Sequence, residues 1–181
     1  RSRGMLIHQL HGDDRVRSGF YEAMENAFSD FPEAGAFFCQ STYIDENGSS
    51  LGVTGLERPD TGIIDNWLGK IFIERRVQTP SIVLRRQVYE SMGAFDGRLD
   101  IFEDWEMWIR VASRFPVGLI PLPLAEYRIS ETSSTSITSR EGSRAQTLNR
   151  LLSIVDEYLP ESFVQAHRRD RSRAQAQYFL Q

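Results

Sequence analysis

Strand-like apolar segments alternate with amphipathic helical stripes along this chain, and this alternation limits most strongly what it can fold into. Apolar residues recur at helical spacing over residues 18–31 and again over 63–73. Between and after them, residues 34–45, 81–84 and 117–120 are rich in β-branched and aromatic residues, which favour strands. The sequence therefore predicts an α/β fold with a sheet flanked by helices.

Other segments complete the expected architecture. Residues 5–10 resemble a short strand, 46–48 a hairpin turn before a further short strand, and 55–62 a loop. Short helices are expected over 87–92, with Gly93 as a left-handed cap, and from about residue 103, with Trp105, Trp108, Ile109, Ala112 and Phe115 on one face. Residues 132–139 are almost all serine and threonine, typical of a mobile lid or hinge. Leu148, Leu151, Leu152, Val155 and Leu159 form one helical stripe before Pro160.

Composition narrows the classes of protein to which the chain can belong. Its 181 residues suit one domain, and a net charge of −4 disfavours nucleic acid as the main partner. The single cysteine, Cys39, rules out a disulfide framework and favours a cytoplasmic setting. No apolar run approaches the roughly 18 residues that a membrane span needs. The chain begins without methionine and is expected to be part of a longer protein.

Two acidic doublets are the candidate chemical groups. Asp13–Asp14 follows the first predicted strand, and ligands of α/β sheets bind beyond the carboxyl ends of strands. Carboxylates are also the preferred ligands of Mg²⁺ or Mn²⁺. Glu103–Asp104 begins a predicted helix, whose dipole would keep Asp104 ionised and able to accept a proton. Each doublet also has a purely structural interpretation, the first as a solvated turn and the second as helix-end stabilisation.

A series of motifs, taken in order and spacing, resembles the acceptor-side half of family-two glycosyltransferases. They are TPSIVLRR (79–86), VYE (88–90), MGAFD (92–96), FEDWEMWIR (102–110) and PLAEYR (123–128), preceded by LHGDD (10–14). The resemblance spans about residues 1–135. It implies a partial GT-A fold, the nucleotide-diphospho-sugar transferase type, over 1–135 and a C-terminal helical extension over 136–181.

The resemblance also implies roles for individual residues. Asp104 would be the catalytic base, with Glu103 as its neighbour. Asp13 matches the metal-binding aspartate, and His11 and Asp14 would contact the nucleotide-sugar donor. The acceptor side would be lined by Trp105, Arg110 and the segment 78–81, in which Ser81 is the named residue, although tryptophan at that spacing is also typical of a protein core. Mn²⁺ or Mg²⁺ would be the cofactor, and the reaction an inverting sugar transfer in polysaccharide or cell-surface glycan synthesis.

The sequence departs from the family pattern at two positions. His11 replaces the first aspartate of the usual Asp-x-Asp motif, and Ser130 stands where a histidine often follows the Tyr-Arg pair. The nucleotide-binding half of the family would precede Arg1, so the isolated chain is expected to transfer little or no sugar. A non-catalytic binding or assembly module derived from the same fold is the alternative. A glycoside hydrolase fits less well, because it would require no metal.

Basic residues gather near the C-terminus. His167, Arg168, Arg169, Arg171 and Arg173 fall on a second predicted helix after Pro160. A solvated helix face is one interpretation. Contact with anionic lipids is another, because basic amphipathic helices lie on membranes and the acceptor would be a glycan or a lipid-linked molecule. A peripheral position at the inner face of the cell membrane would follow, with nucleic acid excluded as a partner.

Overall fold

The computed structural model describes residues 3–130 and 144–179. These residues belong to two compact units. Unit 1 consists of Arg1–Asp65, Arg76–Gly93 and Arg114–Ser130, and unit 2 of Asn66–Arg75, Ala94–Ser113 and Glu131–Gln181. The predicted α/β class is confirmed. The predicted boundary between residues 135 and 136, and the serine and threonine segment 132–139, lie outside the described residues.

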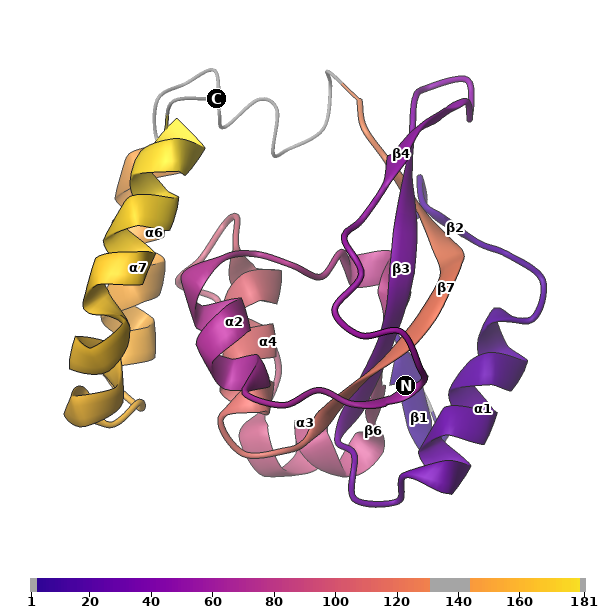
Figure 1. The fold of residues 1–181 in the computed structure, drawn as a ribbon, viewed down its shortest axis with the longest axis horizontal. Helices are drawn as coiled ribbons and strands as arrows, with labels where there is room; N and C mark the ends of the chain where they lie inside the picture. Colours follow the sequence, from indigo (N-terminus) through magenta and orange to yellow (C-terminus); the bar gives the residue numbers. More distant parts are fainter. Residues whose placement is uncertain (1–2, 131–143, 180–181) are drawn as a thin grey trace. The chain divides into compact units, whose positions relative to one another are not determined.

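Unit 1 is built on a seven-stranded mixed sheet (Figure 1). Its strands are β1 (Leu6–His8), β2 (Arg15–Val16), β3 (Ala36–Ile44), β4 (Ser50–Val53), β5 (Gly62–Ile63), β6 (Ile82–Arg85) and β7 (Val117–Arg128). The strand order is β1-β6-β3-β7-β2, with β4 paired to β3 and β5 to β7. β3 and β7 are parallel, and every other pairing among the described strands is antiparallel.

This topology fixes the position of the first acidic doublet. β6 lies antiparallel between β1 and β3, so β1, β3 and β7 all point the same way. Their carboxyl ends therefore share one edge of the sheet. β1 and β2 lie at opposite ends of the strand order, so residues 9–14 must cross that edge to connect them.

Helix α1 (Phe20–Asp30) covers one face of this sheet. Its apolar stripe packs against residues of β3, β6 and β7, as the 3.6-residue period predicts. The buried residues of this core are Phe20, Met24, Ala27, Phe28, Ala34, Phe37, Cys39, Val83, Ile120 and Ala125. The 3₁₀ helix η1 (Thr79–Ser81) leads into β6, which continues into helix α3 (Arg86–Met92).

Unit 2 contains four described helices: α2 (Trp67–Ile73), α4 (Glu103–Ala112), α6 (Arg144–Asp156) and α7 (Glu161–Phe179). α2 packs on α4 and α7, and α6 packs on α4 and α7. The predicted stripe of α6 is buried, with Leu148, Leu151 and Val155 almost inaccessible to solvent. Within 3–130 and 144–179, no helix has the length and apolar character that crossing a membrane would require.

The structure corrects the expected course of four segments. Ile63 lies in β5, not in a helix, and α2 begins only at Trp67. α4 ends at Ala112, so Phe115 is not on its face. Gly93 has the expected positive φ of 78°, but its ψ of −172° lies outside the left-handed helical region.

The fourth correction concerns β7, which does not stop at residue 120. It continues through Pro121 and Pro123 to Arg128. Proline cannot donate to a ladder hydrogen bond, and the register between β7 and β3 shifts on either side of Gln40, opposite Pro123. These irregularities let a strand with two prolines remain inside the sheet.

Candidate functional site

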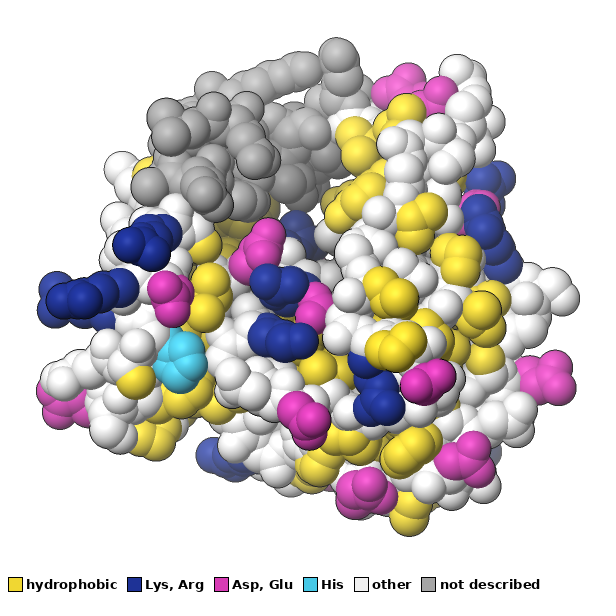
Figure 2. Space-filling model, in the orientation of Figure 1, with side chains coloured by type: hydrophobic (Ala, Val, Ile, Leu, Met, Phe, Trp, Pro, Cys, Tyr) yellow, Lys and Arg dark blue, Asp and Glu magenta, His cyan; other side chains and the backbone are white. Residues whose placement is uncertain are grey.

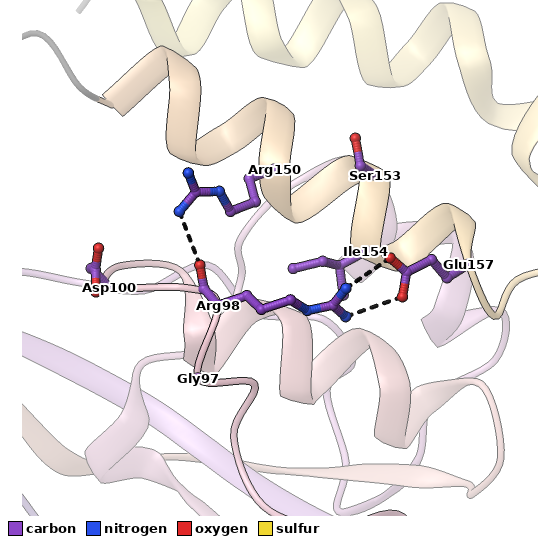
Figure 3. Close-up of a pocket in the computed structure, with 7 residues that line it drawn as sticks. All are labelled: Gly97, Arg98, Asp100, Arg150, Ser153, Ile154 and Glu157. Atoms are coloured by element: carbon purple, nitrogen blue, oxygen red, sulfur yellow. Dashed lines mark hydrogen bonds and ion pairs between the residues drawn. The ribbon is translucent and has the colours of Figure 1, made fainter.

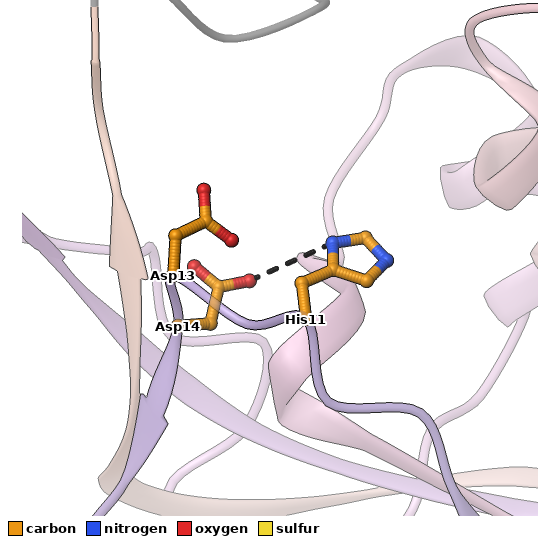
Figure 4. A group of neighbouring side chains, drawn as sticks. All are labelled: His11, Asp13 and Asp14. Carbon is orange, nitrogen blue, oxygen red and sulfur yellow. Dashed lines mark ion pairs between the residues drawn. The ribbon is translucent and has the colours of Figure 1, made fainter.

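The turn His11–Asp14 is the first part of the candidate site. Asp14 N donates to His11 O at 3.3 Å, which closes the turn directly before β2. His11 and Asp13 are exposed, whereas Asp14 is only 7% exposed. The turn therefore presents two exposed side chains and one buried carboxylate at the carboxyl edge of the sheet (Figure 4).

The two oxygens of Asp14 have different surroundings. Oδ1 accepts the backbone N–H of Arg128 at 2.9 Å, whereas the buried Oδ2 has no hydrogen-bond partner among the described residues. The His11 ring lies nearby, with its Nδ1 3.8 Å from Oδ2. Burial raises the pKa of the Asp14 carboxyl, and the Arg128 N–H partly offsets this by favouring the charged form. A buried carboxylate oxygen with no donor is an unusual and costly arrangement.

Arg128, the last residue of β7, fixes the shape of this turn. Its Nε donates to Asp13 O at 2.9 Å. Its Nη1 donates to Asp45 O at 2.6 Å and to Glu46 O at 2.9 Å, in the hairpin between β3 and β4. One guanidinium thus connects the acidic turn to the hairpin tip. The sequence placed Arg128 in a family motif but gave no indication of this structural role.

His11, Asp13 and Asp14 together could hold a metal ion. One ligand atom from each lies within 4.8 Å of the others. Two carboxylates and one imidazole suit Mn²⁺, and the carboxylates also suit Mg²⁺. The buried Asp14 Oδ2, which lacks a donor, is the observation that makes a cation fit this group.

Asp104 belongs to unit 2, at the start of α4. Phe102 precedes the helix with φ 66° and ψ 9°, a left-handed conformation that is uncommon for a bulky residue. Phe102 caps the helix without a side-chain hydrogen bond, and Asp104 Oδ1 instead accepts the N–H of Trp105 at 2.7 Å. Asp104 Oδ2 accepts Arg75 Nη2 at 2.6 Å, and Asp104 is 6% exposed. The carboxylate is therefore held at both oxygens.

The remaining predicted residues have defined positions. Glu103 is partly exposed at the first turn of α4. Trp105 is buried and donates its indole N–H to Ile71 O at 2.6 Å, a core position. Arg110 forms two hydrogen bonds with Glu106, both of 2.9 Å. Ser81 is buried in η1 of unit 1, where its hydroxyl donates to Gln78 O at 2.7 Å. The acceptor-side roles of Trp105, Arg110 and Ser81 stay predictions.

The structure brings some of these residues together. His11, Asp13 and Asp14 form one group in unit 1, which also contains Ser81. Glu103, Asp104, Trp105 and Arg110 follow one another on α4 in unit 2.

Unit 2 also has a cavity of about 440 Å³ that none of the predicted site residues lines (Figure 3). It lies between residues 97–100 and α6. Arg98 bridges Asp96 and Glu157 there, and Arg150 donates to Arg98 O at 3.2 Å. The lining residues are Gly97, Arg98, Asp100, Arg150, Ser153, Ile154 and Glu157. The Arg98 guanidinium is therefore already paired with two carboxylates.

Comparison with known proteins gives a distant relative and no family. No protein-family model matches the chain. The chain is 29% identical over 189 aligned positions to Uncharacterized protein MT1568 of Mycobacterium tuberculosis (strain CDC 1551 / Oshkosh). The match covers 89% of this chain and 54% of that protein, so the chain spans about half the length of its relative.

Proposed function

We propose that this chain is the acceptor-side part of an inverting, metal-dependent glycosyltransferase with a GT-A type fold. The observation that carries the proposal is the His11–Asp14 turn at the carboxyl edge of β1, β3 and β7, with its buried, donor-free Asp14 Oδ2. Ligands of α/β sheets bind beyond this edge, and a carboxylate oxygen of this kind suits a bound cation. The motif series of residues 79–128 supplies the family assignment.

The donor side of the reaction is assigned to unit 1. Asp13, Asp14 and His11 would hold Mn²⁺ or Mg²⁺ with the diphosphate of a nucleotide sugar. A cation bound there offsets the negative charge that develops on the leaving diphosphate. Arg128 would maintain the turn in its binding shape through its bonds to Asp13, Asp45 and Glu46.

The proton-transfer role is assigned to Asp104. Its carboxylate would accept the proton of an acceptor hydroxyl as that oxygen attacks the anomeric carbon from the face opposite the leaving group. Inversion at that carbon follows. The Arg75 guanidinium at 2.6 Å and the Trp105 N–H at 2.7 Å hold the carboxylate in one orientation. The acceptor would be a glycan or a lipid-linked molecule on the cytoplasmic side.

Substitution of Asp104 by Asn tests the assignment of the base. Nucleoside diphosphate release from a panel of nucleotide sugars would be measured with Mn²⁺, on this chain and on the longest product of its gene. Asp104→Asn should lower turnover at least about 10³-fold, because the general base is lost. Asp100→Asn, an exposed aspartate of the same unit, is the matched control and should retain activity. Wild-type turnover by Asp104→Asn would exclude Asp104 as the base.

The alternative is a non-catalytic binding or assembly module, and one observation favours it. Both oxygens of Asp104 accept hydrogen bonds, one of them from the backbone N–H of Trp105 in the first turn of α4. A purely structural carboxylate would look the same. Metal-dependent release of nucleoside diphosphate by the wild-type gene product would exclude the module.

A membrane surface is proposed as a further partner. Three exposed arginines of α7, Arg168, Arg169 and Arg173, form what we call the α7 arginine triplet. Basic side chains are visible over this helix in Figure 2. Arg171 is different, because it donates to Asp156 at 3.1 Å and lies over the Phe72 ring. The triplet would adsorb to anionic lipid headgroups, with each arginine contributing about 1 kcal/mol.

A further inference from the structure

On β3 and beside it, three buried polar atoms have no hydrogen-bond partner among the described residues. They are Ser41 Oγ, Thr42 Oγ1 and the amide oxygen Oε1 of Gln78. Gln78 is 8% exposed, so its amide oxygen has little access to bulk water. An unsatisfied buried acceptor costs about 1–3 kcal/mol, a cost that a ligand donor would remove.

Gln78 is held in place by one contact of its side chain and by two contacts of its backbone. Its Nε2 donates to the hydroxyl of Tyr43 at 3.1 Å. Its backbone oxygen accepts both the N–H of Ser81 at 3.0 Å and the Ser81 hydroxyl at 2.7 Å. η1 is in turn anchored to β1, because His8 Nε2 lies 3.0 Å from Pro80 O. The amide is therefore tied to Tyr43 through Nε2, and the backbone that carries it is fixed by η1.

The surroundings of Gln78 suit a polyhydroxylated ligand. Tyr43 and Tyr127 are register partners on β3 and β7, and their rings meet edge to face with centroids 6.1 Å apart. Both tyrosines are partly exposed, and tyrosine faces pack well against the C–H groups of sugars. Arg128, the residue after Tyr127, binds Asp14 through its backbone N–H. Tyr43, Tyr127 and the acidic turn thus lie at the same edge of one unit.

We propose that Gln78 is a specificity-determining residue that accepts a hydrogen bond from one sugar hydroxyl, with Tyr43 orienting its amide. This inference rests on the proposed function, because it names a contact for the sugar that the enzyme would handle. A hydroxyl is the matching group because it can donate its proton to Oε1 while its own oxygen remains able to accept a further hydrogen bond. Ser81 acts here as the residue that positions Gln78, not as a ligand of the sugar.

An NMR titration of the 181-residue chain with methyl glycosides tests this contact. Methyl glucoside, galactoside and mannoside would be added without nucleotide or metal, together with their monodeoxy analogues. We expect saturable shifts of the Gln78 side-chain amide and of Tyr43 with at least one sugar. One deoxy analogue should bind about tenfold more weakly, because a single hydrogen bond to a neutral acceptor is lost.

Two variants complete the test. Gln78→Met keeps the side-chain length, should weaken the preferred sugar about tenfold, and should no longer distinguish it from the deoxy analogue. Gln40→Met is the matched control, since Gln40 donates to Thr54 O at 2.8 Å and its amide oxygen is not among the buried unpartnered atoms. It should bind as the wild type does.

Two results would overturn the inference. The first is that none of the glycosides causes a saturable shift of the Gln78 amide signal. This result comes from the wild-type chain and does not depend on the folding of any variant. The other is an equal effect of Gln78→Met and Gln40→Met. Failure of the glycosyltransferase proposal is recognised separately, by the absence of Asp104-dependent nucleoside diphosphate release, because the titration contains neither donor nor metal.

Discussion

Asp14→Asn is the substitution that most directly examines the acidic turn. The variant keeps an amide oxygen that can accept the Arg128 N–H, so the 2.9 Å bond that closes the turn onto β7 is retained. The substitution changes Oδ2, the buried oxygen that has no donor among the described residues, into the nitrogen of a neutral amide. In the presence of a chelator at pH 7, we expect the variant to be about 1 kcal/mol more stable than the wild type.

The pH dependence follows from the raised pKa of Asp14. The folded state binds the Asp14 proton more tightly than the unfolded state does. The contribution of protonated Asp14 to folding stability is therefore fully present below its ordinary pKa of 3.8. This contribution is lost as the pH rises through the pKa that Asp14 has in the folded state. The stability difference between variant and wild type should therefore shrink as the pH falls toward 3.8.

Mn²⁺ should reverse the order of stability. At a free Mn²⁺ concentration about 100 times its Kd, the wild type should gain about 2.7 kcal/mol and the Asp14→Asn variant far less. Urea unfolding followed by circular dichroism, with chelator and with Mn²⁺, measures both quantities. Asp13→Asn is the matched control, because Asp13 is exposed. It should weaken the Mn²⁺ effect while leaving the stability in chelator within about 0.5 kcal/mol of the wild type.

Two results would refute this reasoning. If Asp14→Asn is less stable than the wild type in chelator at pH 7, Asp14 serves the fold and its charge is not an unmet cost. If Mn²⁺ stabilises the wild type and both variants equally, the ion binds elsewhere on the chain.

Two further outcomes are expected from the structure. Burial lowers the pKa of His8, and its bond to Pro80 only partly offsets this, so the chain should lose stability as the pH falls below 6.5. His8→Gln should reduce that loss in urea titrations between pH 7 and 5, and an unchanged slope would contradict it. Replacing the α7 arginine triplet with glutamine should abolish co-sedimentation with phosphatidylserine liposomes, whereas Arg171→Gln should retain it. Equal binding by the two variants would remove the triplet as the lipid contact.

Periodicity predicted the elements that have one buried face. α1, β3 and α6 follow the sequence closely, because an amphipathic stripe or a run of β-branched and aromatic residues has one low-energy way to bury itself. The carboxyl-edge position of Asp13–Asp14 was also predicted. This prediction depended only on recognising the end of the first strand and the polar turn that follows it, and the structure confirms the position.

Other features depend on partners that are distant in the sequence. β7 continues past Pro121 because it bulges against β3 there, with residues 121, 122 and 124 unpaired in the register, and no local signal in the sequence predicts the bulge. Trp105 and Trp108 have nearly all of their surface covered, since α4 is surrounded rather than half-buried. The segment 78–81 was expected on the acceptor side, but Gln78 itself was not distinguished within it, because the environment of its amide oxygen depends on Tyr43, which lies 35 positions away in the chain.

The Arg128 guanidinium has a consequence for the evolution of this sheet edge. It joins Asp13 to the hairpin tip at Asp45 and Glu46, so the lengths of two loops are tied to one side chain. An insertion in either loop would separate carbonyls that Arg128 contacts at the same time. Among relatives of this chain, changes in loop length at 11–14 and 45–48 should therefore occur together, and should coincide with replacement of the arginine.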